Sequence, residues 1–295
     1  MAARSSMSPT LRAMGDLGQD TAVERVDEAR FRAKLSAEWE IWGPMGGYLA
    51  STALRAVAAT TPFARPASFF CHYLGVAAFD TVDITVTELR GARTAAAHRV
   101  EVSQDGRRIL EGTAWSIGDV MGLEHDLAEA PRLPGPDELK SIPELLAGAG
   151  VEGKPPFPFW NNLDSKPIDF RVDWPPPAPL PPVWQEWCRF KPTATFADPW
   201  VDACRSVVLI DVQSWPAASR QHVTGPPEFY APSLDLYVAF HDPQPHSEWL
   251  LCDGYAPVAR HGLMGWTGRL WSVEGRMVAS GGGQLLCRRL PQPPA

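Results

Sequence analysis

Residues 46–57 read GGYLASTALRAV, a run of small and apolar side chains with one charged residue, Arg55. A helix without a polar face is typical of a buried position, so this run predicts a buried helix. Extended runs follow it, beginning at Pro66 and continuing over residues 80–88, 93–102 and 109–117, the last two joined by the turn QDGR at 104–107. The order predicts a helix packed against an antiparallel meander.

The second half repeats this order. A mostly apolar helix is predicted over residues 200–214, with Pro216 as its stop, and strand-like runs cover residues 232–241, 248–255, 264–272 and 277–288. A buried helix wrapped by an antiparallel sheet is the hotdog arrangement, so the chain is predicted to be an α+β double hotdog. Because one hotdog leaves open sheet edges, we expect the two sheets to join into one continuous sheet with both helices on one side.

Proline usage sets the expected domain boundaries. We expect a disordered tail over residues 1–22, a first hotdog over 23–126, a proline-rich crossover linker over 127–183 and a second hotdog over 184–291. Residues 26–42 are expected to open the first hotdog with a strand, although residues 27–35 fit a short helix equally well. The linker carries aromatic residues and is expected to lie against the folded units, and strand aromatics are expected mostly in the core: Phe69, Phe240, Trp249, Trp266 and Trp271.

Composition narrows the function classes. The net charge is −7 with a pI near 5.5 and no basic run, which argues against a nucleic-acid partner. Neither a signal peptide nor an apolar run of about 18 residues is seen, so a cytoplasmic protein without a membrane partner is expected, and a homo-oligomer is left open. The five cysteines show no C-x-x-C spacing, so we expect free thiols and no metal site.

Other catalytic motifs are missing from the sequence. No Gly-x-Ser-x-Gly elbow and no nucleotide-binding glycine loop occurs, which disfavours serine hydrolases, oxidoreductases and kinases. His241, Asp242 and His246 are interpreted as a polar turn, because a third well-spaced metal ligand is lacking.

Four stretches carry a family resemblance. WGPMGGY at 42–48, SLDLYVAFH at 233–241, EWLL at 248–251 and GRMVAS at 275–280 resemble the acyl-CoA thioesterase II family. The resemblance covers nearly the whole chain except the tail and the linker. It implies a double hotdog fold and hydrolysis of an acyl-CoA substrate to a free acid and coenzyme A, as in fatty acid and lipid metabolism, with no cofactor, metal or covalent nucleophile.

The resemblance also implies catalytic residues. In that family an Asp, a Ser or Thr and a Gln hold and activate a water, and Asp211 and Ser233 match the first two positions. The position of the Gln falls on Gly283, whereas Gln284 is one residue later. A one-residue shift turns a strand side chain to the other face, but a bulge in Gly281–Gly283 would return Gln284 to the site.

The three candidate catalytic residues also fit structural roles. Asp211 lies in LIDV within an apolar helix, where burial raises a carboxyl pKa and suits a general base, but it fits equally an exposed stripe paired with Arg205 or Arg220. Ser233 also fits a turn or cap, and Gln284 a satisfied polar group beside a bulge. Asp235 is expected to be structural.

The helix start suggests a substrate contact. Amides of Gly46, Gly47 and Tyr48 are predicted to hold the thioester carbonyl oxygen, although the glycines fit tight helix packing equally well. The alternative function is a double hotdog that binds acyl-CoA but turns it over poorly. Side chains of Asp211, Ser233 and Gln284 that converge on one point would favour the enzyme. Side chains that point to different cavities would favour the binding function.

Overall fold

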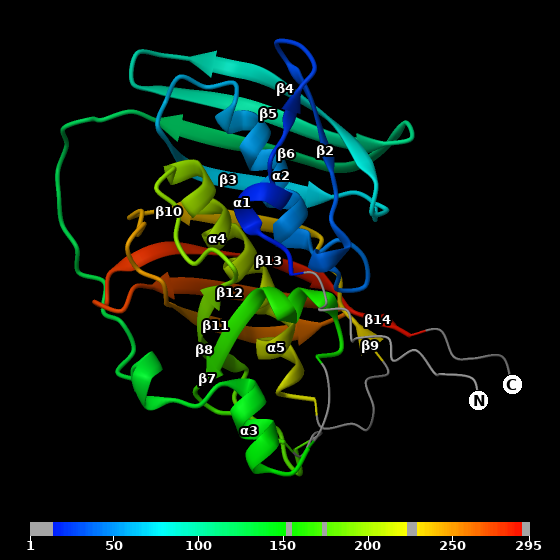
Figure 1. Ribbon diagram of the computed structural model, residues 1–295, viewed down its shortest axis with the longest axis vertical. Coiled ribbons are helices and arrows are strands. Elements are labelled where there is room, and N and C mark those ends of the chain that lie inside the picture. The colour runs from blue at the N-terminus through cyan, green and yellow to red at the C-terminus, as the bar shows by residue number, and fades with distance from the viewer. Residues whose placement is uncertain (1–13, 152–154, 173–175, 223–228, 291–295) are drawn as a thin grey trace, which may run out of the picture.

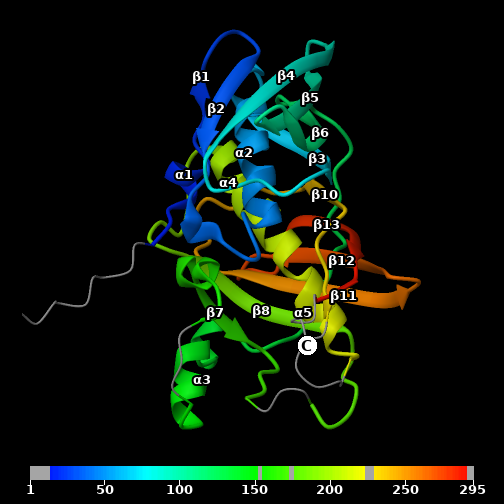
Figure 2. The same cartoon turned by 90° about the vertical axis from the view of Figure 1, so that its right-hand side faces the viewer.

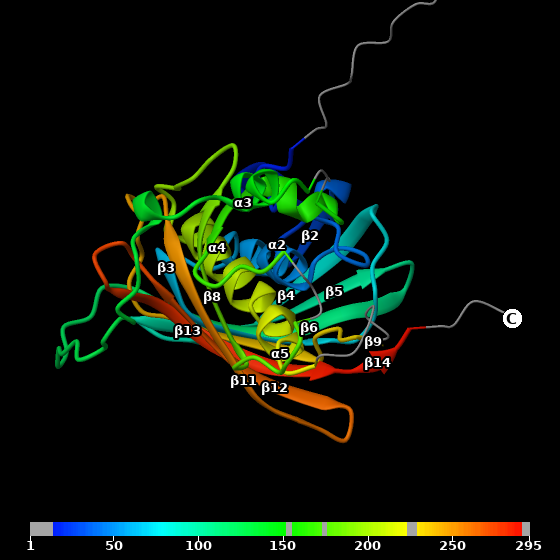
Figure 3. The ribbon, with the colours of Figure 1, turned by 90° about the horizontal axis from the view of Figure 1, so that it is seen from below.

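The computed structural model describes residues 14–151, 155–172, 176–222 and 229–290. Two buried helices, α2 (Gly46–Ala58) and α4 (Pro199–Val212), lie against a 12-stranded antiparallel sheet that curves around them (Figures 1 and 3). This arrangement confirms the predicted double hotdog.

Each half contributes five equivalent strands. In spatial order the first half supplies β2 (Arg30–Lys34), β4 (Thr81–Gly91), β5 (Ala95–Gln104), β6 (Arg107–Ile117) and β3 (Arg65–Tyr73). The second half mirrors that order with β10 (Asp235–Phe240), β13 (Met277–Leu286), β12 (Leu263–Trp271), β11 (Leu250–Arg260) and β8 (Val183–Phe190). Short strands β1 (Glu24–Arg25) and β7 (Leu163–Pro167) extend the two ends.

Strands β3 and β10 join the two halves at the centre of the sheet (Figure 2). Their register places Leu236 opposite Cys71 and Val238 opposite Phe69, and all four side chains are buried. The prediction of one continuous sheet with both helices on one side is therefore confirmed. Trp266 and Trp271 are also buried, and Trp249 and Phe240 are partly buried, so the strand aromatics are mostly core residues as expected.

The two buried helices pack against each other in opposite directions. At one end Gly47 of α2 approaches Val208 of α4, and one turn further along α2 the Ser51 hydroxyl donates to the carbonyl of Cys204 at 3.3 Å. The first turn of α2 therefore meets the last turn of α4. This meeting point is where the predicted site residues lie.

The two helices begin differently. Asp198 precedes α4 and accepts a hydrogen bond from the Trp200 amide at 2.8 Å, with Pro199 in the first turn, which is a strong helix start. Met45 precedes α2, and only its Sδ accepts the Tyr48 amide at 3.3 Å. Because Met45 has no side-chain oxygen, an acceptor for the first turn of α2 must come from elsewhere.

Two boundaries differ from the sequence prediction. Helix α1 (Leu17–Asp20) lies inside the predicted tail and buries Leu17; residues 1–13 of that tail lie outside the described residues. Helix α5 (Ser214–Ser219) contains Pro216, which was predicted to be a stop. Pro216 is tolerated because it lies in the first turn of α5, where its missing amide hydrogen costs no hydrogen bond within the helix.

The proline-rich linker has structure of its own. It contains helix α3 (Ile142–Gly148), strand β7 and the short helices η2 (Pro136–Glu138) and η3 (Pro158–Asn162). Phe159 in η3 is fully buried and meets Trp39 of η1 (Ala37–Trp39) edge-on, at a centroid distance of 6.0 Å. Phe159 thus packs on the first hotdog, whereas Trp174, another aromatic residue of the linker, lies outside the described residues. A separate two-stranded sheet pairs β9 (Phe229–Tyr230) with β14 (Arg288–Arg289).

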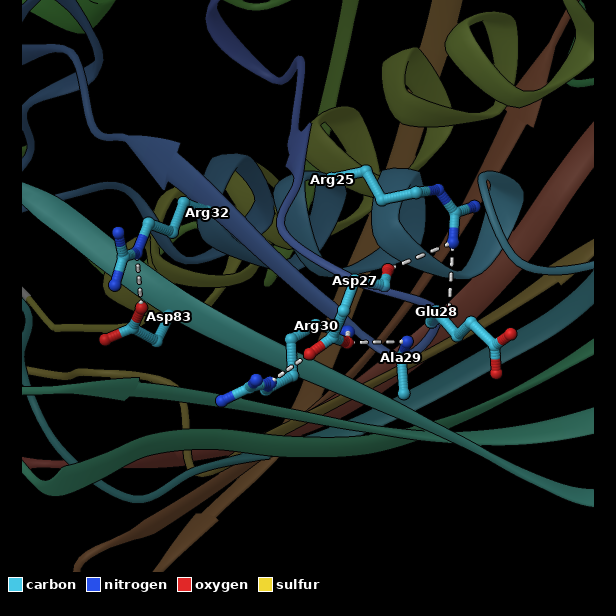
Figure 4. Close-up of polar contacts among 7 residues, drawn as sticks. All are labelled: Arg25, Asp27, Glu28, Ala29, Arg30, Arg32 and Asp83. Carbon is cyan, nitrogen blue, oxygen red and sulfur yellow. Dashed lines mark hydrogen bonds and ion pairs between the residues drawn. The ribbon is translucent and has the colours of Figure 1, made fainter.

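Charged side chains cover the β1–β2 edge of the sheet (Figure 4). Arg25 donates to the carbonyl oxygens of Asp27 and Glu28, Arg30 pairs with Asp27, and Arg32 reaches Asp83 of β4 at 2.9 Å. These pairs are exposed and add little stability, but charge on an edge strand discourages pairing with another chain. Among the helices that the structure describes, none is long and apolar enough to cross a membrane.

Candidate active site

Asp211 lies in the last turn of α4 and is 6% exposed. Its Oδ2 accepts the amide hydrogen of Gly47 at 2.8 Å, and its Oδ1 accepts the hydroxyl hydrogen of Ser233 at 2.9 Å. Ser233 is half-buried at the entry to β10, where it forms an isolated bridge with Leu285. The fold therefore brings together Asp211, Ser233 and Gly47 from three separate segments.

The surroundings of Asp211 explain its electrostatics. Burial raises the pKa of its carboxyl from 3.8 to about 6, although the hydrogen bonds from Ser233 and Gly47 oppose that rise. The carboxylate lies at the N-terminus of α2, where the helix dipole favours negative charge, and it supplies the acceptor that Met45 cannot. The Asp211 carboxyl group is thus buried and held in one orientation by two hydrogen bonds, and its pKa of about 6 lies close to neutral pH.

Within the part of the chain that the structure describes, no arginine pairs with Asp211, contrary to one of the sequence alternatives. Among the described residues, Arg205 forms a buried ion pair with Asp202, and Arg220 pairs with Asp169. A buried carboxylate without a cation keeps a raised pKa and can accept a proton near neutral pH, which is the property of a general base.

Gly46 and Gly47 have different roles at the start of α2. A Cβ on Gly47 would lie 2.7 Å from the Val208 Cα, so the glycine is required by helix packing, and its amide already donates to Asp211. A Cβ on Gly46 would lie 2.8 Å from Asp211 Oδ2. The Gly46 amide has no hydrogen-bond partner within the described part of the chain. Among the described residues at this helix start, Gly46 therefore offers the free amide beside the carboxylate.

Tyr48 does not belong to the site, although it was predicted to contact the substrate. Its ring stacks on Trp39 with centroids 5.3 Å apart, and its hydroxyl donates to the carbonyl of Asp20 at 2.9 Å and accepts from the Ser36 amide at 3.0 Å. Its backbone amide donates a hydrogen bond to the Sδ atom of Met45. Helical rotation points this side chain into the core of the first hotdog, away from Asp211.

Gln284 is not brought to Asp211 either. Strand β13 pairs with β12 without a register shift from Ala279 to Leu286, so the predicted bulge in the glycine run is not formed on that side. Gln284 is exposed, and its Nε2 lies 3.3 Å from where a Cβ of Gly265 would be. With Leu285 buried and Gln284 exposed, strand alternation keeps the glutamine on the outer face.

The preceding position, Gly283, has no room for a side chain. A Cβ there would lie 2.4 Å from the carbonyl oxygen of Asp235 and 2.9 Å from its Oδ1. That same Oδ1 accepts a hydrogen bond from the backbone amide of Gln284 at 3.0 Å, so Asp235 is structural, as expected. The glutamine position of the resembled family is therefore unfilled in this chain.

Sequence reasoning missed Tyr73 at the end of β3. A Cβ on Gly46 would lie 3.1 Å from the Tyr73 Oη, so the phenol flanks the same small space as Asp211 Oδ2. Strand alternation with Phe69 and Cys71 was the available signal, because it places Tyr73 on the helix-facing side of the sheet. In the described ranges, no group of three or more His, Cys, Asp or Glu residues could hold a metal ion.

Two family models match the chain on either side of residues 118–133. The acyl-CoA thioesterase N-terminal domain matches residues 35–117, and the acyl-CoA thioesterase C-terminal domain matches residues 134–284. The gap between the two matches spans the end of the predicted first hotdog and the start of the predicted linker, and the C-terminal match includes the rest of that linker, residues 134–183.

Solved structures share the fold over almost the full chain. Acyl-CoA thioesterase II TesB2 from Mycobacterium marinum has a TM-score of 0.75 and 20% identity, covering 93% of this chain and 99% of that one. The tesB protein of Mycobacterium avium subs paratuberculosis has a TM-score of 0.74 and 21% identity, covering 93% and 99%. A hot dog fold protein from Alicyclobacillus acidocaldarius has a TM-score of 0.74 and 19% identity, covering 95% and 100%.

Proposed function

The chain belongs to the acyl-CoA thioesterase II family, and from its site geometry we propose that it hydrolyses an acyl-CoA thioester to a free acid and coenzyme A by direct attack of water. The observation that carries the proposal is Asp211, a buried carboxylate with no cationic partner in the described residues and a pKa of about 6. Such a group is half-titrated near the pH at which a general base is most effective. Acyl-CoA hydrolysis is a reaction of lipid metabolism.

Each group has a part in the proposed reaction. The Asp211 carboxylate takes a proton from a water as the water oxygen attacks the carbonyl carbon of the thioester. Negative charge moves to the carbonyl oxygen, where the free amide of Gly46 at the helix N-terminus donates a hydrogen bond. When the C–S bond breaks, the thiolate of coenzyme A receives the proton from Asp211, and the carboxylate is restored.

Ser233 positions the base. Its hydroxyl donates to Asp211 Oδ1, which fixes the plane of the carboxylate and stabilises the ionised form. The Gly47 amide does the same at Oδ2. With two hydrogen bonds already made, the remaining lone pairs of the carboxylate are held in fixed directions, which favours proton transfer from a positioned water.

One observation favours the alternative of a double hotdog that binds acyl-CoA and turns it over poorly. Gln284 is exposed on the outer face of the sheet, and Gly283 leaves the family's third position without a side chain. A site built from Asp211 and Ser233 alone would hold the water by fewer contacts.

Release of free thiol from acyl-CoAs of graded chain length decides between the two functions. We expect the wild-type protein to release thiol and Asp211→Asn to be at least about 10²-fold slower. Asp253→Asn is the matched control, because Asp253 is a buried carboxylate of the same half that contacts Gln185 and Arg269 instead of the site. Binding of acyl-CoA by the wild-type protein without thiol release at any chain length would favour the binding function.

A further inference from the structure

The hydroxyl of Tyr73 is a buried donor whose one described contact is with the thiol of Cys71, a weak acceptor. Its oxygen has almost no accessible surface and no oxygen or nitrogen partner among the described residues. A buried hydroxyl without a strong acceptor is costly to retain, so proteins seldom keep one unless a water or ligand completes it. Tyr73 is held in place because β3 is a central strand, paired with β6 on one side and β10 on the other.

The geometry around Gly46 shows what the hydroxyl faces. From the Cβ position of Gly46, Asp211 Oδ2 lies 2.8 Å away and Tyr73 Oη 3.1 Å away, so both atoms border the small space that the glycine leaves. Gly46 is partly accessible, whereas Gly47, next to it, is buried. One acceptor and one donor therefore face the same small space beside Gly46.

A group between these two atoms must donate to the carboxylate and accept from the phenol. Burial, with Cys71 and Asp211 nearby, raises the pKa of Tyr73 well above its ordinary value, so the phenol stays protonated and acts as the donor. A thioester carbonyl oxygen has no hydrogen to donate and would be repelled by the carboxylate. A water molecule satisfies both partners.

We infer that Tyr73 binds the attacking water together with Asp211, and so provides the contact that the family's glutamine position, Gly283, lacks in this chain. The inference rests on the proposed function. In the hydrolysis, the water donates one hydrogen to Asp211 Oδ2 and accepts the Tyr73 hydroxyl hydrogen with one lone pair, while its other lone pair attacks the carbonyl carbon. Tyr73 keeps its proton throughout, and Asp211 takes the proton of the water.

Tyr73→Phe tests the inference because it removes only the hydroxyl. We expect kcat to fall about 10- to 100-fold from misplacement of the water, with KM within about 2-fold of wild type. The melting temperature should stay the same or rise, because among the described residues the lost hydroxyl contacts only the weak acceptor Cys71. A merely structural role predicts the reverse, with lower stability and an unchanged kcat.

Tyr48→Phe is the matched control. Tyr48 is a buried tyrosine in the same half, but its hydroxyl makes two hydrogen bonds, to Asp20 and from Ser36, and lies outside the site. Its loss should lower the melting temperature and leave kcat unchanged. If Tyr73→Phe behaves in the same way as Tyr48→Phe, Tyr73 is a structural residue and the inference is wrong.

A crystal structure gives a readout that does not depend on activity. We expect ordered density for a water within hydrogen-bond distance of Tyr73 Oη and Asp211 in the wild-type protein and its loss in Tyr73→Phe. If wild type hydrolyses acyl-CoA but Tyr73→Phe has full turnover, the inference fails and the proposed function stands. If wild type releases no thiol, the proposed function fails, and missing density between the two residues would also remove the water site.

Discussion

Replacing Asp211 by asparagine should remove catalysis while making folding at neutral pH easier. Asparagine has nearly the same shape, so its oxygen can accept the Gly47 amide hydrogen, and its NH₂ group can donate to the Ser233 hydroxyl after that hydroxyl rotates. What the substitution removes is the charge that must be buried. Stability and turnover should therefore change in opposite directions.

The magnitude follows from the pKa of Asp211. Burial raises it from 3.8 to about 6, so the folded state binds the proton more tightly than the unfolded state. A raised folded-state pKa contributes stability that is complete below 3.8 and is lost as the pH rises to about 6. At about 1.4 kcal/mol per pKa unit, the loss is about 3 kcal/mol at pH 7. An asparagine at this position does not titrate, so the variant avoids the loss.

Denaturant unfolding of both proteins from about pH 4 to about pH 7.5 measures this difference. Subtracting the two free energies of unfolding cancels the other titrating groups. We expect the difference to shift by about 3 kcal/mol in favour of the asparagine variant as the pH rises, while turnover falls at least about 10²-fold. A difference that is flat with pH would show that Asp211 is not a desolvated carboxylate, and full turnover would show that it is not the base.

Three further outcomes are expected. The kcat/KM of the wild-type enzyme should rise about tenfold per pH unit below about 6 and level off above it, because Asp211 must be deprotonated; a pH-independent acid limb would contradict this. Gln284→Ala should change turnover by less than about 2-fold in a thiol-release assay, because an exposed side chain on the outer face is seldom felt at the site. Gly47→Ala should lower the free energy of unfolding by about 1–3 kcal/mol, since its Cβ would lie 2.7 Å from the Val208 Cα; unchanged denaturation would refute the packing argument.

The sheet was predictable because the chain repeats its own order of helix and strands. Continuous runs of small and apolar residues identify both central helices within two residues of their observed ends, and the open edges of each hotdog predict that the two sheets join, as they do at β3 and β10. Single residues that usually mark where a helix begins or ends were less reliable, because their effect depends on their position within the helix. Pro216 stops a helix in most contexts, but here it lies in the first turn of α5. The short helix α1 is marked locally only by its N-cap residue Asp16.

The site was predictable in part. Asp211 and Ser233 follow from the family resemblance, and the structure brings them together at 2.9 Å. The side of the sheet that Gln284 faces depends on the register of three strands, which the sequence does not specify locally. Tyr73 carries no motif, and its place beside Gly46 follows only from how β3 passes the start of α2.

Because helices α2 and α4 begin differently, one chain should bind one substrate molecule and not two. A homodimer of single hotdogs must place the same residues at both ends of its helix pair, and so would hold two identical centres. In this chain α4 receives its cap from its neighbour Asp198, whereas α2 receives its cap from Asp211 in the opposite half. Within the described residues, only one end of the helix pair carries a buried carboxylate without its own cation. Titration with a tight substrate analogue should therefore saturate at one molecule per 295-residue chain.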